Sequence, residues 1–82
     1  MTRRRLEMMG DRIEAVLASH KITGHCHGGY VNTHSVVFAV TFAPGNSLRQ
    51  LMACKDEIEL ALGHAVLIHH EPYVRVRVLG WR

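Results

Sequence analysis

Cysteines, long apolar segments and export signals are scarce or missing in this sequence, and each absence excludes a class of protein. Only two of the 82 residues are cysteines, Cys26 and Cys54, and no signal-peptide core follows the basic start. We therefore expect free buried thiols in a cytoplasmic protein. No apolar run approaches the roughly 20 residues that a transmembrane helix needs. With 48% hydrophobic residues the chain is too apolar to be disordered, and its length suits a single core without membrane contact.

Motifs that carry catalysis are also missing. A phosphate-binding loop needs a lysine at a fixed offset from its glycines, whereas Gly28-Gly29 is followed by Tyr30. Neither cysteine lies in a context that marks a nucleophile. The carboxylates of Asp56, Glu57 and Glu59 have a helical spacing that spreads them over a solvent-exposed face. We therefore expect no enzymatic activity and no cofactor.

The formal net charge of +3 is distributed unevenly along the chain. Arg3, Arg4 and Arg5 contribute +3, residues 6–71 carry four basic and seven acidic side chains for −3, and Arg75, Arg77 and Arg82 contribute another +3. Basic ends around an acidic middle suggest contact with an anion such as nucleic acid, or a tail that only aids solubility. We treat residues 1–5 as a basic N-terminal arm and residues 6–82 as the folded domain.

The first half of the chain predicts a helix followed by a β-hairpin. Apolar residues recur three and four apart over residues 6–19, which predicts an amphipathic helix. Residues 22–28 predict a short strand, and Gly28-Gly29 with Asn32 is typical of a turn. Residues 34–42 are rich in β-branched and aromatic side chains and predict a second strand.

The second half predicts one more helix and two more strands. Pro44 ends the strand before it, and Asn46 or Ser47 can cap a helix over about residues 47–62, with Gly63 as its left-handed C-terminal cap. Residues 64–70 and the segment after Pro72 predict the last two strands. The order is αββαββ. We expect a single α+β domain with a four-stranded, mostly antiparallel sheet and two helices on one face.

The last strand carries the candidate binding residues. Val74, Val76 and Val78 face inward, so alternation places Tyr73, Arg75, Arg77, Leu79 and Trp81 on the outer face. Arginines there can contact phosphates, and the aromatic rings can stack or fill a pocket on a partner. The predicted DNA- or partner-binding residues are Arg3, Arg4, Arg5, Tyr73, Arg75, Arg77 and Trp81.

Seven histidines make a metal site an alternative. His25 and His27 lie on the same side of one strand, and His69-His70 on another strand nearby supplies further candidate ligands. Zinc sites usually show paired Cys/His motifs, whereas Cys26 points away from its two neighbours. We therefore rank metal binding last, expect no metal, and interpret the histidines as solvent-facing.

Short segments between residues 11 and 79 follow an order that is known from other proteins. They are Ile13-Glu14-Ala15-Val16-Leu17, Lys21-Ile22-Thr23-Gly24 leading into a strand, Gly28-Gly29, the strand to Phe42, Ala43-Pro44-Gly45, and a helix with Asp56-Glu57-Ile58 and Ala61-Leu62 before the final two strands. Together they resemble the alpha domain of FtsK/SpoIIIE-type DNA translocases. The family's Gly-Pro turn appears here as Gly29-Tyr30, and its closing hairpin is tightened to His70-Glu71-Pro72.

The resemblance implies the non-catalytic part of a translocase, because the family's catalytic motifs lie in a RecA-like motor domain. In that family the alpha domain forms one tier of a hexameric ring around duplex DNA and couples to the motor tier. The resemblance therefore implies a homo-oligomer in chromosome segregation and cell division, with nonspecific duplex DNA or the motor domain of the same protein as partner. Arg75 and Arg77 would line the channel or contact a neighbouring subunit. The alternative is a stand-alone protein-interaction or regulatory module that uses the open face of the sheet, or an exposed edge strand, to dock on a protein partner or on itself.

Overall fold

Helix α1 covers Arg3–Ser19 and packs through one apolar side. In the computed structural model, which describes residues 1–81, Met9, Ile13 and Leu17 are buried along that side. Thr2 caps the helix, because its Oγ1 accepts a hydrogen bond of 3.1 Å from the N–H of Arg5. The three arginines that the sequence analysis assigns to an arm therefore form the first turn of the helix.

Strands β1 (Gly24–Val31) and β2 (Ser35–Phe42) form an antiparallel hairpin. The glycine pair expected in the turn lies inside β1, where the register shifts between Gly28 and Tyr30. Gly29 has φ +88°, and a Cβ on it would lie 2.7 Å from the side chain of Leu6. The turn itself is built on Asn32, whose Oδ1 accepts the N–H of Ser35 at 2.8 Å. Strand β1 therefore begins at Gly24 and extends past Gly28 to Val31, whereas the sequence predicts a strand over residues 22–28.

The single helix expected over residues 47–62 is divided into α2 (Leu48–Ala53) and α3 (Lys55–Leu62). Between them Cys54 has φ −94° and ψ 0°, and its N–H donates to the carbonyl of Leu51 at 3.0 Å. Leu51, Cys54 and Ile58 are all buried. No glycine or proline marks this break, so the sequence pattern does not reveal it. The end of α3 is as predicted, since Gly63 has the left-handed conformation with φ 72°.

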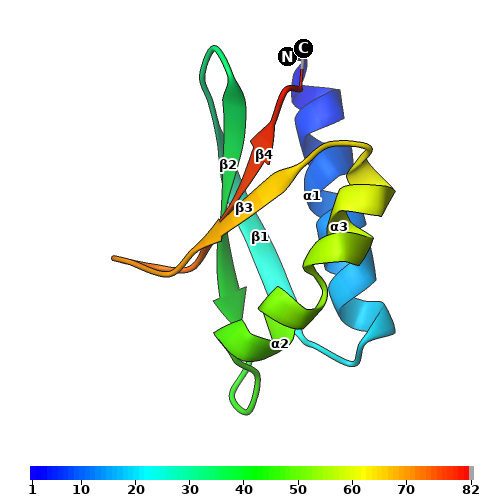
Figure 1. Cartoon of the computed structure of the whole chain (residues 1–82), viewed down its shortest axis with the longest axis vertical. Coiled ribbons are helices and arrows are strands. Elements are labelled where there is room, and N and C mark those ends of the chain that lie inside the picture. The colour runs from blue at the N-terminus through cyan, green and yellow to red at the C-terminus, as the bar shows by residue number, and fades with distance from the viewer. Residues whose placement is uncertain (82) are drawn as a thin grey trace.

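Strands β3 (Val66–His69) and β4 (Arg75–Leu79) complete the sheet, whose order is β1-β2-β4-β3 with all neighbours antiparallel. Figure 1 shows α1 and α3 side by side on one face of this sheet and α2 at one end of the molecule. The prediction of an α+β domain with a four-stranded antiparallel sheet is confirmed. Strands β1 and β3 are its two edges.

The core lies between the two long helices and the inner face of the sheet. Its fully buried members include Ile13 and Leu17 from α1, Val36 from β2, and Val76 and Val78 from β4. Both cysteines are free, Cys54 buried and Cys26 half-buried. Over residues 1–81 no helix combines the length and apolar character that crossing a bilayer requires.

A helix carboxylate caps the free edge of β3. The Oε2 of Glu59 accepts the N–H of Val66 at 2.9 Å and lies 3.4 Å from the Nζ of Lys55. This hydrogen bond covers one of the N–H groups that an edge strand presents to other chains. The hydrogen bond from the N–H of Val66 is the main reason why the pKa of Glu59 is lowered. Partial burial raises this pKa, and the positive charge of Lys55 lowers it again. Glu59 thus has a structural role beyond the solvated acidic face that its spacing predicts.

We expect Glu59 to make stability depend on pH in the acid range. Its pKa is lower in the folded protein than in the unfolded chain, so its contribution is complete above the unfolded value and is lost as the pH falls through the folded value. In urea unfolding, Glu59→Gln should be less stable than the wild type at neutral pH, and the difference should shrink as the pH falls. Asp56→Asn on the same helix is the control. A difference for Glu59→Gln that does not change with pH would contradict the assignment.

Candidate nucleic-acid interface

The face of the sheet opposite α1 and α3 carries no helix, and we call it the open face (Figure 1). The strand register aligns its outward positions in two central rows, Tyr30–Val37–Arg77–Leu67 and His27–Ala39–Arg75–His69. Together with His25, Thr41 and Leu79, these positions define the open face. Alternate residues such as Val36, Phe38, Val76 and Val78 point into the core and are buried.

Arg75 and Arg77 lie in adjacent rows and are held by neutral oxygens. Arg75 donates to the carbonyls of Glu71 and Tyr73, and its guanidinium lies 5.5 Å from the centre of the Tyr73 ring. Arg77 donates to the Oγ of Ser35 at 3.1 Å. In the described part of the chain no carboxylate lies within ion-pair distance of either guanidinium. Both charges are therefore oriented by the fold without being neutralised.

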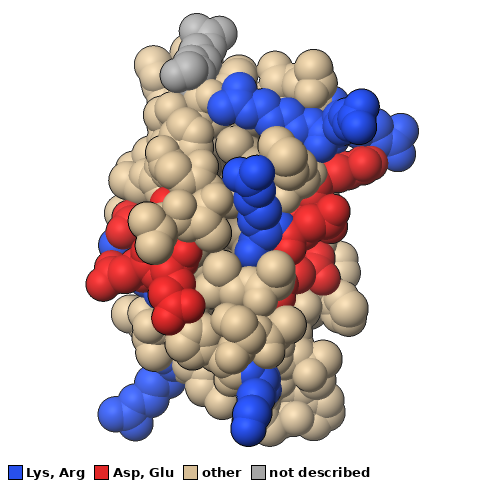
Figure 2. Space-filling model, turned by 90° about the vertical axis from the view of Figure 1, so that its right-hand side faces the viewer, with Lys and Arg blue, Asp and Glu red and all other residues tan. Residues whose placement is uncertain are grey.

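Carboxylates are concentrated on the other side of the molecule. Three belong to α1 (Glu7, Asp11, Glu14), three belong to α3 (Asp56, Glu57, Glu59), and Glu71 lies in the connection between β3 and β4. Figure 2 views the helix side and shows acidic side chains in two groups across the middle, with lysine and arginine side chains at both ends and between the groups. The outward strand positions of the open face hold no carboxylate. The fold thus separates the six carboxylates of α1 and α3 from the arginines of β4, whereas Glu71 lies near Arg75 and offers it a backbone carbonyl.

The arginines of the N-terminus lie at one end of the molecule rather than on the open face. The start of α1 and the end of β4 are close together there (Figure 1), and the Nη2 of Arg5 donates to the carbonyl of Trp81 at 2.8 Å. Arg3 lies 3.4 Å from Glu7 in an exposed pair. The structure therefore brings Arg5 to the end of β4, although 76 positions separate it from Trp81 in the sequence.

Trp81 does not belong to the outer face, which corrects the prediction from alternation. Its side chain is only 9% exposed, packs in the core and donates from Nε1 to the carbonyl of Asn32 at 3.2 Å. The reason is local: β4 ends at Leu79, and Gly80 follows with φ 63°. A strand alternates only while it is extended, so this turn sends the next side chain inward.

The histidines do not converge on a metal site. His25 and His27 do lie on the same side of β1, with ring centres 6.4 Å apart. His69 is on β3, the opposite edge of the sheet, and two strands separate it from β1. Among residues 1–81 no three His, Cys, Asp or Glu side chains form a group that could hold a metal ion. The expectation that His69 lies near the His25–His27 pair is wrong, because topology and not sequence order sets the strand neighbours.

Two open-face residues are missed by the sequence analysis. Tyr30 is 72% exposed and Leu67 is 44% exposed, and they share a row with Arg77. Tyr30 faces outward because the bulge at Gly28-Gly29 shifts the alternation of β1. The adjacent glycines within a strand pattern are the signal that could have indicated a bulge.

Comparison with models of known protein families gives no match for this chain, and comparison with curated proteins gives none either.

Proposed function

We propose that this chain is a non-catalytic module of an FtsK/SpoIIIE-type DNA translocase and contacts the phosphates of duplex DNA through its open face. The observation that carries the proposal is the pair Arg75 and Arg77 on a face whose outward strand positions hold no carboxylate. Its place in a hexameric ring that passes DNA during chromosome segregation and cell division rests on the resemblance described above. The motor domain of the same protein supplies the ATP hydrolysis in this proposal.

The contacts of the two arginines suit a polyanion. Their hydrogen bonds to carbonyl and hydroxyl oxygens fix the guanidinium groups while each keeps a full positive charge. Arginine–phosphate contacts position a protein on a duplex but do not read its sequence, so the binding is nonspecific. The first turn of α1 lies at the same end of the molecule as the C-terminal end of β4, where Arg5 donates to the carbonyl of Trp81. Three arginines there oppose the helix dipole, and a phosphate would offset that unfavourable arrangement.

A salt titration of binding to a labelled random-sequence duplex tests the proposal. Affinity falls as salt rises, and each lost phosphate contact makes the slope of log affinity against log salt less steep by about 0.9. We therefore expect Arg75→Gln/Arg77→Gln to reduce that slope by about two and to weaken binding at low salt by about tenfold or more. Fluorescence anisotropy measures both quantities.

Lys21→Gln/Arg49→Gln is the matched control, since it removes two exposed charges from outside the open face. It should change the slope much less. An equal effect of the two double variants would mean that general charge attraction, not the open face, binds the duplex. A wild-type titration that stays flat at low salt would reject direct DNA contact by this chain.

A protein partner on the same face is the second candidate, and the exposed Tyr30 and Leu67 favour it. Tyrosine and arginine are enriched among interface hot spots, and Tyr30 shares a row with Arg77. The same anisotropy titration separates the two candidates. If the open face binds DNA, Tyr30→Ser/Leu67→Ser should bind the duplex with the same salt slope as the wild type. If a protein partner or a second copy docks there instead, its binding should weaken in this variant.

A further inference from the structure

Strand β1 is a long edge strand whose outer side is unpaired. It has eight residues against four in β3, and neither proline nor lysine interrupts it. The N–H of Cys26 points away from β2, since it donates to the Oε2 of Glu14 at 3.3 Å. By alternation the N–H groups of Gly24 and Gly28 point the same way. Among the described residues no strand pairs with this edge, which leaves it as a template for an extended segment.

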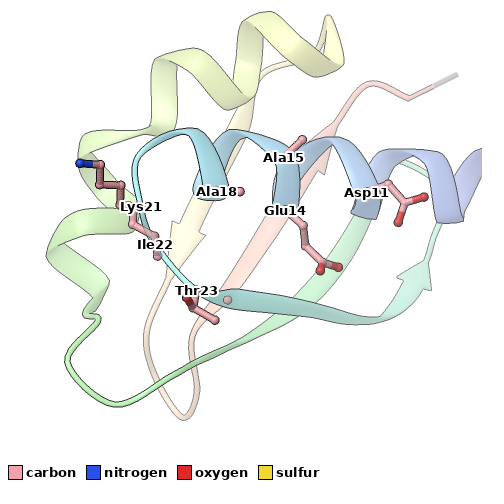
Figure 3. A pocket seen from close by; sticks show the side chains of 8 residues that line it. Asp11, Glu14, Ala15, Ala18, Lys21, Ile22 and Thr23 are labelled. Carbon is pink, nitrogen blue, oxygen red and sulfur yellow. The ribbon is translucent and has the colours of Figure 1, made fainter.

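A groove follows this edge between β1 and α1. Its walls include Asp11, Glu14, Ala15 and Ala18 of α1, and Thr23 and Gly24 lie opposite them. A second hollow shares Asp11 and Glu14 with the first, and its lining also includes Glu7, Gly10 and Cys26. Figure 3 shows the carboxylates of Asp11 and Glu14 projecting from α1 toward β1, while the side chain of Lys21 points away. Small side chains on both sides leave room for a chain to lie along the edge.

The charge of the groove selects its occupant. Glu7, Asp11 and Glu14 follow each other at spacings of four and three along α1, so they share one side of the helix. Arg3, which also lines the hollow, lies 3.4 Å from Glu7, and the Nδ1 of His25 lies 3.4 Å from Glu14. Beneath the carboxylates, burial first, and then the charges of Glu14 and Asp11, raise the pKa of the Cys26 thiol to about 12. Among the residues that line the two hollows three are acidic and two, Arg3 and Lys21, are basic, so the groove is net acidic and disfavours an anion beside Asp11 and Glu14. It repels nucleic acid and also the same edge of a second copy, which would bring two sets of these carboxylates together.

We propose that this groove binds an extended polypeptide segment with alternating lysine or arginine residues, which pairs with β1 as a fifth strand. Its backbone hydrogen-bonds to the free edge, and its basic side chains, all on one side, lie against Asp11 and Glu14. A carbonyl of the segment replaces Glu14 at the N–H of Cys26. The carboxylate that is released exchanges a long hydrogen bond of 3.3 Å from a neutral amide for an ion pair with a lysine or arginine of the segment. The site is separate from the open face.

The test uses a fluorescein-labelled peptide of alternating lysine and threonine that is as long as β1. We expect it to bind, and Asp11→Asn/Glu14→Gln to weaken it by about tenfold. The amide that replaces the Glu14 carboxylate keeps an oxygen for the N–H of Cys26 in the free protein, so the fold is preserved. The matched control, Asp56→Asn/Glu71→Gln, removes two carboxylates outside the groove and should bind as the wild type does.

Two further measurements test whether the peptide pairs with β1 as a strand. The same peptide with alternate amides N-methylated should bind about tenfold more weakly, since those amides can no longer pair with β1. The amides of Gly24, Cys26 and Gly28 should gain protection from hydrogen exchange only with the unmethylated peptide. Arg75→Gln/Arg77→Gln should bind the peptide normally, so a failure of the DNA proposal leaves this result unaffected.

Four outcomes would overturn the inference. The first three are no binding of the peptide at low salt, binding of the N-methylated peptide that is as tight as that of the unmethylated one, and a control variant that weakens binding as much as Asp11→Asn/Glu14→Gln does. The fourth is self-association of the protein that protects the β1 amides from exchange and that the peptide does not disrupt. The last outcome would assign the edge to a second copy.

Discussion

Leu17→Ala should lower the free energy of unfolding by about 2–5 kcal/mol, the range for removing a fully buried leucine side chain. Leu17 is completely buried in the core, and its Cδ1 lies close to the backbone of Gly24, where a Cβ would be 3.1 Å away. The side chain therefore fills the space between α1 and the start of β1. Domains of this kind are stable by only about 5–15 kcal/mol, so this loss is a large share of the total. Urea unfolding followed by circular dichroism measures it.

Leu60→Ala is the control for this prediction. Leu60 is 84% exposed on α3, so the same change of side chain removes almost no buried surface. We expect a change within about 0.5 kcal/mol. Equal losses for the two variants would contradict the burial of Leu17 in the core and the exposure of Leu60 on the surface.

Trp81→Ala should cost about 3–5 kcal/mol, because it removes a large buried ring. The ring packs in the core, and its Nε1 donates to the carbonyl of Asn32 in the turn between β1 and β2. The backbone carbonyl of Trp81 accepts from Arg5 in α1. Trp81 thus connects the end of the chain to both the hairpin and the first helix. Chemical unfolding monitored by circular dichroism gives the loss of stability.

Trp81→Phe and Tyr73→Ala are the controls. Phenylalanine keeps an aromatic ring in the core but loses the indole N–H and part of the ring volume, so the cost should be smaller than for alanine. Tyr73 is exposed beside Arg75, and its replacement should leave stability almost unchanged. If Trp81→Ala instead left stability intact and abolished binding to a partner, the residue would belong to an interface, as its place in the sequence suggests.

Local sequence patterns predict most of the secondary structure. Strand β2 follows from its β-branched residues, and the end of α3 follows from Gly63, because both depend on preferences of a few neighbouring residues. The patterns fail at Cys54 and at Gly28-Gly29. A break without glycine or proline, and a bulge in place of a turn, both depend on how the segments pack against the rest of the chain.

The candidate binding face could be predicted in part. Arg75 and Arg77 alternate with Val76 and Val78, so their outward positions follow from the period of a strand. Trp81 could not be placed in this way, because the positive φ of Gly80 interrupts the alternation. His69 could not be placed either, since the order β1-β2-β4-β3 puts its strand at the edge far from His25 and His27.

The sequence by itself determined the α+β class, the approximate helices and strands, and the alternation that turns two arginines outward, because these depend on local preference and periodicity. Only the tertiary structure decided which strands are edges, where the carboxylates gather, and that the two basic ends of the chain meet at Arg5 and Trp81. These features join residues far apart in the chain. They are set by packing and strand order, which no local pattern encodes.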